Sequence, residues 1–165
     1  MEIRLYSDND SITCLTNLLH RSYQSLAKLG FEYWASHQSS GITAKRISEG
    51  ECYVAVQNDV IIATILLKPP CNSSGHPHYD RGDVASIHQF AVEPDLQKSG
   101  VGSRLLEFVE SRAIKLGANE LACDTAEGAS HLIDMYKRRG YRKVGKASWD
   151  GTNYDSFILS KLLHR

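Results

Sequence analysis

Hydrophobic and polar positions repeat with two different periods along this chain of 165 residues. Short apolar or alternating runs indicate β-strands, and apolar positions spaced by three and four indicate helices that are apolar on one face. Strands are expected at residues 3–6, 53–56, 60–67, 87–92, 121–123, 144–149 and 154–162. Helices are expected at residues 12–29, 43–49 and 101–116, and in a segment that ends near residue 140.

Turn-forming residues separate these elements. Asp8 or Asp10 is expected to cap the first helix, and Gly30 to end it. Asn58-Asp59 predicts a tight hairpin turn, whereas the segment 69–83 has the Pro, Ser, Gly and His content of a loop. This order of elements predicts an α+β or mixed α/β fold with a partly antiparallel sheet, in a single domain over residues 1–165.

Composition narrows the classes of function. The 19 basic and 19 acidic residues cancel, so no nucleic-acid partner is expected. The four cysteines form no C-x-x-C pair and fall mostly in apolar runs, which is typical of reduced cytosolic thiols. The longest apolar run, residues 60–67, is too short to span a bilayer, and the N-terminus lacks the apolar region of a signal peptide. We therefore expect a cytoplasmic protein without a membrane partner.

The most informative segment is Gln97-Lys98-Ser99-Gly100-Val101-Gly102, which joins an expected strand to an expected helix. A helix N-terminus exposes unpaired N–H groups, and glycine lets an anion approach the backbone, so this junction could hold a phosphate. It is not a Walker loop, because Ser103-Arg104 follows the second glycine. It is not a dinucleotide loop either, because the third glycine position is Leu105.

The remaining pattern, Gln-x-x-Gly-x-Gly after Phe90-Ala91-Val92-Glu93-Pro94, resembles the acetyl-CoA-binding segment of the GCN5-related N-acetyltransferases. Tyr136, followed by Gly140 and Tyr141, resembles the second signature of that family. The resemblance implies a central, mostly antiparallel sheet with a splayed parallel strand pair, flanked by about four helices. It also implies an acetyl-CoA-dependent N-acetyltransferase that transfers the acetyl group directly within a ternary complex.

The resemblance assigns roles to two segments. The backbone of the glycine segment would bind the pyrophosphate, and the peptide groups of Ala91 and Val92 would meet the amides of pantetheine. The N–H of Phe90 would face the acetyl oxygen, where a preorganised donor stabilises developing charge. The expected pyrophosphate-binding residues are Gln97, Lys98, Ser99, Gly100, Val101, Gly102 and Ser103.

Tyr136 is the expected general acid, because a phenol stays protonated at neutral pH and can donate to a departing thiolate. Its helical spacing from Ile133 also suits a core aromatic residue. Many relatives carry Asn seven residues before this Tyr, where this chain has Ala129; Ser130 could substitute.

The general base is the least defined role. Some relatives use a Glu where this chain has Ser86, which cannot act as a base at neutral pH. His88 would share a strand face with Ser86 and could serve as base or water relay, and a structural histidine is the alternative. Asp124 and Glu32 are lesser candidates.

The acceptor is expected to be the primary amine of a small molecule. A protein or peptide acceptor and a catalytically silent acyl-CoA-binding module are the alternatives, and a homodimer is left open. No metal is expected, because His76-Pro77-His78 in a loop favours a surface turn over a metal site. The aromatic residues of segment 31–34 could form a wall over the acceptor or belong to the core.

Overall fold

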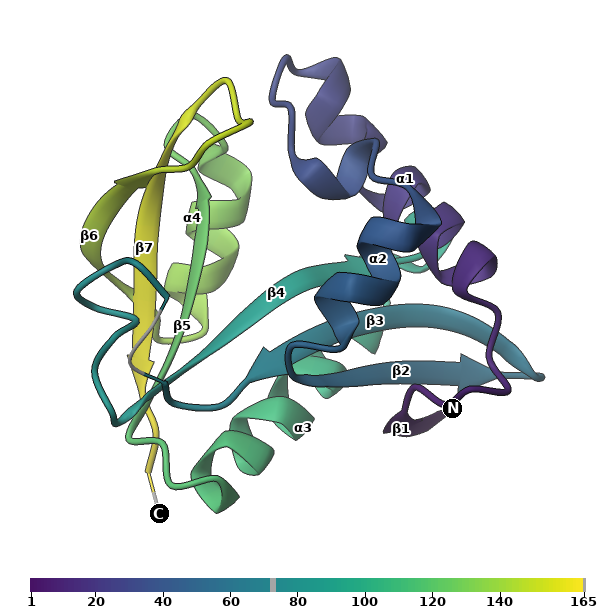
Figure 1. The fold of residues 1–165 in the computed structure, drawn as a ribbon, viewed down its shortest axis with the longest axis horizontal. Coiled ribbons are helices and arrows are strands. Elements are labelled where there is room, and N and C mark those ends of the chain that lie inside the picture. The colour runs from purple at the N-terminus through teal and green to yellow at the C-terminus, as the bar shows by residue number, and fades with distance from the viewer. Residues whose placement is uncertain (72–73, 165) are drawn as a thin grey trace. The chain divides into compact units, whose positions relative to one another are not determined.

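The computed structural model describes residues 1–71 and 74–164, which form seven strands and four α-helices (Figure 1). The strands are β1 (Glu2–Leu5), β2 (Glu51–Gln57), β3 (Val60–Lys68), β4 (Val84–Val92), β5 (Glu120–Ala126), β6 (Arg142–Ser148) and β7 (Asp155–Leu162). The helices are α1 (Ile12–Lys28), α2 (Ser40–Ile47), α3 (Val101–Lys115) and α4 (Ser130–Arg138), with short 3₁₀ turns η1 (Trp34–Ser36) and η2 (Pro94–Leu96).

The strands follow the order β1-β2-β3-β4-β5-β7-β6 in one sheet. The recorded pairs β1–β2, β2–β3, β5–β7 and β6–β7 are antiparallel. The strands β4 and β5 are parallel, with a register that covers only Val84–Ser86 against Glu120–Ala122. This arrangement confirms the predicted mixed α/β class, its mostly antiparallel sheet, its parallel pair and its four helices.

The first compact unit comprises residues 1–68 and 88–109. Its core joins Leu15 of α1 to Cys52 and Val54 of β2 and Leu66 of β3, with Ile47 of α2 packed against them. Burial of these apolar side chains holds α1 and α2 against β2 and β3. The same unit contains residues 88–92 of β4.

The second compact unit comprises residues 69–87 and 110–165. Its core joins Val84 of β4, Ala122 of β5 and Ile158 of β7 to Tyr79 of the loop before β4. The chain passes from one unit to the other within β4 and again within α3, so both elements contribute to both units.

Most predicted elements are present, and the differences lie at their ends. The turn at Asn58 and Asp59 has φ values of 51° and 60°, as a type I′ hairpin turn requires. Gly30 follows the end of α1 with a φ of 92°. The predicted strand at 87–92 begins three residues earlier, at Val84, because Val84–Ser86 pair with β5. The described part of the 69–83 segment contains no helix or strand, and residues 72 and 73 lie outside the described residues.

Two helix starts were predicted wrongly. Ser11, not Asp8 or Asp10, caps α1, and its Oγ accepts from the N–H of Cys14 at 3.2 Å. Ser39 caps α2, because its Oγ accepts a hydrogen bond from the N–H of Ile42. This helix therefore covers Ser40–Ile47 and not residues 43–49. In both cases a short hydroxyl side chain satisfies an N–H of the first turn.

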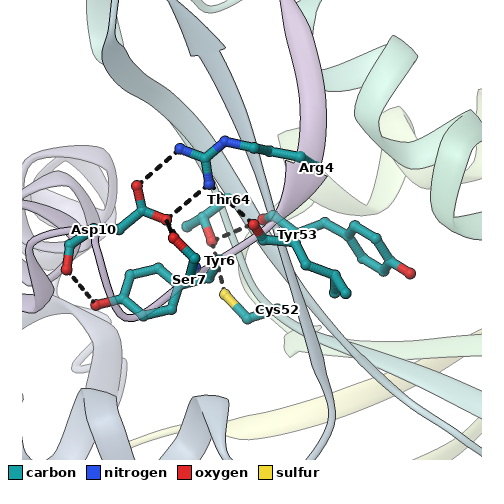
Figure 2. A network of polar contacts seen from close by, with 8 residues as sticks. Arg4, Tyr6, Ser7, Asp10, Cys52, Tyr53 and Thr64 are labelled. Atoms are coloured by element: carbon teal, nitrogen blue, oxygen red, sulfur yellow. Dashed lines mark hydrogen bonds and ion pairs between the residues drawn. The ribbon is translucent and has the colours of Figure 1, made fainter.

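Asp10 instead joins β1 to the start of α1 (Figure 2). Its carboxylate accepts from both terminal nitrogens of Arg4 at 2.8 Å, and from the backbone N–H of Ser7 at 2.8 Å. The hydroxyl of Tyr6 donates to the Asp10 carbonyl at 3.0 Å. The Arg4 hydrogen bonds are the main cause that lowers the pKa of Asp10 to about 2.

In the part of the chain described, no helix is both long and apolar enough to cross a membrane.

Candidate functional site

The middle of β4 departs from a regular strand at Gln89, which has a φ of 49°. This left-handed conformation is rare for a residue with a side chain and costs of the order of 1–3 kcal/mol. It re-aims the strand directly before Phe90, as a β-bulge does near many active sites. Phe90 is the residue whose N–H the family resemblance assigns to the acetyl oxygen.

Helix α1 supplies hydrogen bonds to the next residues of β4. The hydroxyl of Tyr23 donates to the carbonyl of Phe90 at 3.1 Å, and the N–H of Val92 donates to Ser22 Oγ at 3.3 Å. Ala91 is buried between them in a cluster with Leu19. Ser22 and Tyr23 were not predicted as site residues, because a polar pair on a helix does not indicate which strand it will contact.

The glycine segment forms a close approach between α3 and β4. A Cβ added to Gly102 would lie 3.2 Å from Val92 Cγ2 and 3.3 Å from Phe90 Cζ, so these two side chains would have to shift to admit any larger residue. Lys98 and Gly100 have φ values of 63° and 93°, and α3 starts immediately after them. A helix start with exposed backbone N–H groups is suited to an anionic group such as a pyrophosphate.

Some side chains of the glycine segment bond to the protein backbone, although the segment is exposed to solvent. Gln97 donates from Nε2 to the carbonyl of Val92 at 3.2 Å, and Ser99 donates to the carbonyl of Leu96. Residues 97–100 are all exposed. The backbone therefore remains the main candidate for anion binding, and the Gln97 side chain has a structural contact that the sequence did not indicate.

His88 stays neutral at physiological pH. Burial is the main cause that lowers its pKa to about 3, and the positive charges of Lys68 and Arg46 lower it further. A neutral imidazole accepts and donates hydrogen bonds, but an imidazolium with this pKa would lose its proton to almost any amine. A pKa lowered in this way makes His88 a weaker candidate for a general base than for a water relay.

A buried polar network lies beside this part of β4. Gln38, 3 % exposed, donates from Nε2 to Gln89 Oε1 at 2.6 Å and to Thr43 Oγ1 at 2.9 Å. Arg46 donates to Gln38 Oε1 at 2.8 Å, and its guanidinium lies 5.5 Å from the ring centroid of Trp34. In the aromatic segment 31–34, Trp34 is therefore exposed and lies under the Arg46 guanidinium. The Tyr33 ring packs against that of Tyr23, with ring centroids 5.4 Å apart.

Tyr136 is the candidate residue of the second unit. It is 7 % exposed on α4, and its ring meets that of Tyr141 edge-on at 5.3 Å. Burial raises the pKa of the Cys123 thiol, and a hydrogen bond from the Tyr136 side chain acts in the opposite direction. Tyr136 therefore combines a packed ring with an oriented hydroxyl, which fits both a core residue and a general acid.

The lesser candidates differ in their surroundings. Asp124 accepts from the Tyr79 hydroxyl at 2.8 Å and from Trp149 Nε1 at 2.9 Å, so two neutral donors hold it. Glu32 is exposed. Ala129 is buried and Ser130 is exposed at the start of α4.

The His76 segment is more than a surface turn. Its Tyr79 is buried in the core of the second unit, and His76 Nε2 lies 3.0 Å from the Lys146 carbonyl. His78 is 3.5 Å from the Glu120 carboxylate. Within the described ranges, no group of three or more His, Cys, Asp or Glu side chains could hold a metal ion.

Comparison with known proteins adds the family. Residues 15–141 match the model of the acetyltransferase (GNAT) family. The chain is 32 % identical over 152 residues to S-(2-succino)cysteine N-acetyltransferase of Bacillus subtilis, covering 91 % of this chain and 90 % of the relative. It is 26 % identical over 140 residues to S-alkylcysteine N-acetyltransferase of the same organism, covering 83 % and 76 %.

Solved structures show the same fold. A GNAT family acetyltransferase from Elizabethkingia anophelis with acetyl-CoA bound has a TM-score of 0.71 and 19 % identity, covering 98 % of this chain and 97 % of the other. An aminoglycoside 6'-N-acetyltransferase complexed with coenzyme A also has a TM-score of 0.71, with 17 % identity and coverages of 100 % and 98 %. The fold expected from the two sequence signatures is confirmed.

Proposed function

This chain belongs to the acetyltransferase (GNAT) family and is an acetyl-CoA-dependent N-acetyltransferase, and we propose that its acceptor is the α-amine of an S-substituted cysteine. The observation that carries the proposal is the match to S-(2-succino)cysteine N-acetyltransferase over nine-tenths of both chains. A second relative is named for S-alkylcysteine. Both names describe small amino acids, which favours a metabolite over a protein as acceptor.

The residues of the glycine segment fit the pyrophosphate of acetyl-CoA. Gly102 leaves open the space that a Cβ would fill against Phe90 and Val92, and α3 begins beside it. We assign the pyrophosphate to the backbone N–H groups from Gln97 to Ser103, where the partial positive charge of the helix start favours an anion. Acetyl-CoA supplies the activated acetyl group and the thiolate leaving group.

The irregular part of β4 around Gln89 is proposed to orient the acetyl group. The N–H of Phe90 is the proposed donor to the acetyl oxygen, and the Tyr23 hydroxyl holds the same residue through its carbonyl. A fixed donor stabilises the charge that grows on this oxygen without reorganisation during the reaction. The peptide groups of Ala91 and Val92 are the proposed partners of pantetheine, with Ser22 as a further polar group beside Val92.

Proton transfer is divided between two residues. Tyr136 is the proposed donor to the departing thiolate, which needs a phenol that is protonated at neutral pH. His88 is the proposed relay: as a neutral imidazole it accepts a hydrogen bond from the attacking amine or from an intervening water, and the proton passes on to solvent. Direct attack of the amine on the thioester within a ternary complex needs no covalent enzyme intermediate.

The test is turnover with a panel of acceptors, measured as release of free thiol from acetyl-CoA. The panel comprises S-methylcysteine, S-(2-succino)cysteine, an amino sugar and a peptide with a free N-terminus. We expect kcat/KM for the two cysteine derivatives to exceed that for the other acceptors by at least about tenfold. Preferential turnover of the peptide or the amino sugar would refute the proposed acceptor, and no turnover with any amine would refute the activity.

A further inference from the structure

Gln89 bears two energetic costs at one position. Its backbone is in the left-handed region, and its side-chain amide nitrogen is buried without a hydrogen-bond partner among the residues that the structure describes. The residue is only 6 % exposed. A buried donor left unsatisfied destabilises the folded state in addition to the backbone strain. Such a combination is typical of a group that is satisfied by a ligand.

The orientation of this amide follows from its neighbours. Arg46 can only donate, so the atom of Gln38 that faces it must be the oxygen. The nitrogen of Gln38 must then face Thr43 and Gln89, and the atom of Gln89 that accepts from it must be the oxygen. The Gln89 NH₂ group is thereby directed away from Gln38. The hydrogen-bond chain from Arg46 therefore makes the nitrogen, and not the oxygen, the end of Gln89 that lacks a partner among the described residues.

The surroundings favour an anion. Arg46 is joined to Gln89 through the side chain of Gln38. The positive charges of Lys68 and Arg46 also act on His88, the residue before Gln89, as lesser causes after burial of its lowered pKa. The Glu49 carboxylate pairs with Lys68 and offsets part of that charge. A buried amide donor near two cations binds a carboxylate oxygen better than a neutral group.

We propose that the side-chain NH₂ of Gln89 binds the carboxylate of the acceptor and determines specificity for amines that carry one. The inference rests on the proposed function and names the group by which the acceptor is selected. In an α-amino acid, one carbon separates the amine from the carboxylate. The amine that attacks the acetyl group therefore lies close to the carboxylate. Two adjacent residues can contact the acetyl oxygen and the carboxylate, through the N–H of Phe90 and the side chain of Gln89.

The main test is Gln89→Glu, which keeps an oxygen acceptor for Gln38 and replaces the donor by a carboxylate. We compare kcat/KM for S-methylcysteine with that for the S-methyl derivative of cysteamine, the same amine without the carboxylate. The substitution should lower kcat/KM for S-methylcysteine by about 100-fold or more. Any effect of the substitution on the neighbouring Phe90 donor acts on both acceptors alike, so the ratio of the two kcat/KM values should fall by about 30-fold or more.

Two further variants separate binding from structure. Gln89→Met removes the donor without adding charge, and should lower kcat/KM for S-methylcysteine selectively by about 10- to 100-fold. Thr43→Val removes the three hydrogen bonds of Thr43 Oγ1, with Gln38, Thr16 and the Ser39 carbonyl, and should lower stability without changing the ratio between the two acceptors. The dissociation constant of acetyl-CoA, measured by calorimetry, should be the same for all variants that fold.

Three results would overturn the inference. One is an equal loss for both acceptors in Gln89→Glu, or in Gln89→Met if the former does not fold. Another is a wild-type enzyme that acetylates S-methylcysteine and the cysteamine derivative equally well, which would leave the N-acetyltransferase activity intact. A wild-type enzyme that acetylates neither would refute the proposed function itself, and with it the role of Gln89.

Discussion

Single residues carry the chemistry, and Tyr136 offers the sharpest test. Tyr136→Phe preserves the packing against Tyr141 and removes the hydroxyl, which is the proposed proton donor and also the hydrogen-bond partner of Cys123. We expect kcat to fall by about 10- to 10⁴-fold with almost unchanged affinity for acetyl-CoA. Steady-state kinetics and calorimetry measure the two quantities.

Tyr141→Phe is the matched control for this prediction. It removes a second buried phenol, whose hydroxyl lies 3.1 Å from Glu110, without touching the proposed donor. Its kcat should stay within about threefold of the wild type. Full activity in Tyr136→Phe would remove the general acid from the mechanism and return this residue to the core.

His88 makes stability depend on pH in a defined direction. Because its pKa is lowered to about 3 in the folded state, it remains neutral there, whereas the unfolded chain binds a proton below about 6.5. The folded state is therefore favoured most above pH 6.5 and loses stability as the pH falls toward 3. The loss amounts to as much as about 1.4 kcal/mol per pH unit.

Urea unfolding of the wild type and His88→Gln at pH 7.5, 6 and 5 tests this linkage. Glutamine does not titrate, so the difference between the two free energies of unfolding should shift in favour of the variant as the pH falls. The other histidines contribute equally to both proteins and cancel in the difference. A constant difference over this range would show that His88 titrates normally.

At the level of elements, the carboxylate of Asp10 holds β1 against the start of α1 (Figure 2). Its pKa of about 2 lies below the value of an unpaired Asp, so its stabilisation is present above pH 4 and is lost as the pH falls toward 2. Allowing for partial exposure of Arg4, we expect Asp10→Asn to lower the free energy of unfolding by about 1–2 kcal/mol at pH 7.

Urea titrations at pH 7, 4 and 2.5 follow this effect. The gap between wild type and Asp10→Asn should be the same at the first two values within about 0.5 kcal/mol, and should narrow at the third. Asp8→Asn is the control, since Asp8 is exposed and lies outside the network of Figure 2. A gap that is independent of pH would assign the effect of Asp10→Asn to lost hydrogen bonds alone.

Helices and strands were predictable where a local repeat of apolar residues determines them. They were less predictable where pairing with a residue distant in the sequence determines them. The hairpin of β2 and β3 follows from apolar runs around Asn58-Asp59. The first residues of β4 did not, because Val84–Ser86 become a strand through pairing with β5. The caps Ser11 and Ser39 were missed because several neighbouring polar residues can cap a helix equally well by composition.

The same distinction applies to the whole molecule. The two signatures around Gly102 and Tyr136 are local sequences, and they sufficed to predict the family and fold that the comparisons confirm. The left-handed backbone of Gln89 and its hydrogen bond to Gln38 join residues 51 positions apart, and no spacing rule indicates them. The residue proposed to select the acceptor is therefore the part of the candidate site least visible in the sequence.

Because β4 and α3 each contribute to both compact units, neither unit can unfold without losing part of a shared element. We therefore expect one cooperative thermal transition for the whole chain. Acetyl-CoA at 100 times its dissociation constant should add about 2.7 kcal/mol of stability. For a chain of 165 residues this corresponds to a rise in Tm of roughly 5–10 °C.

Scanning calorimetry of the wild type, Gly102→Glu and Gly102→Gln measures this shift. Both substitutions place a side chain against Phe90 and Val92, so both should lower the Tm of the free protein similarly. Only the glutamate adds a negative charge where the pyrophosphate is expected, so Gly102→Glu should show no shift with acetyl-CoA and Gly102→Gln a reduced one. An undiminished shift in Gly102→Glu would place the pyrophosphate elsewhere, and two separate transitions would show that the units unfold independently despite their shared strand and helix.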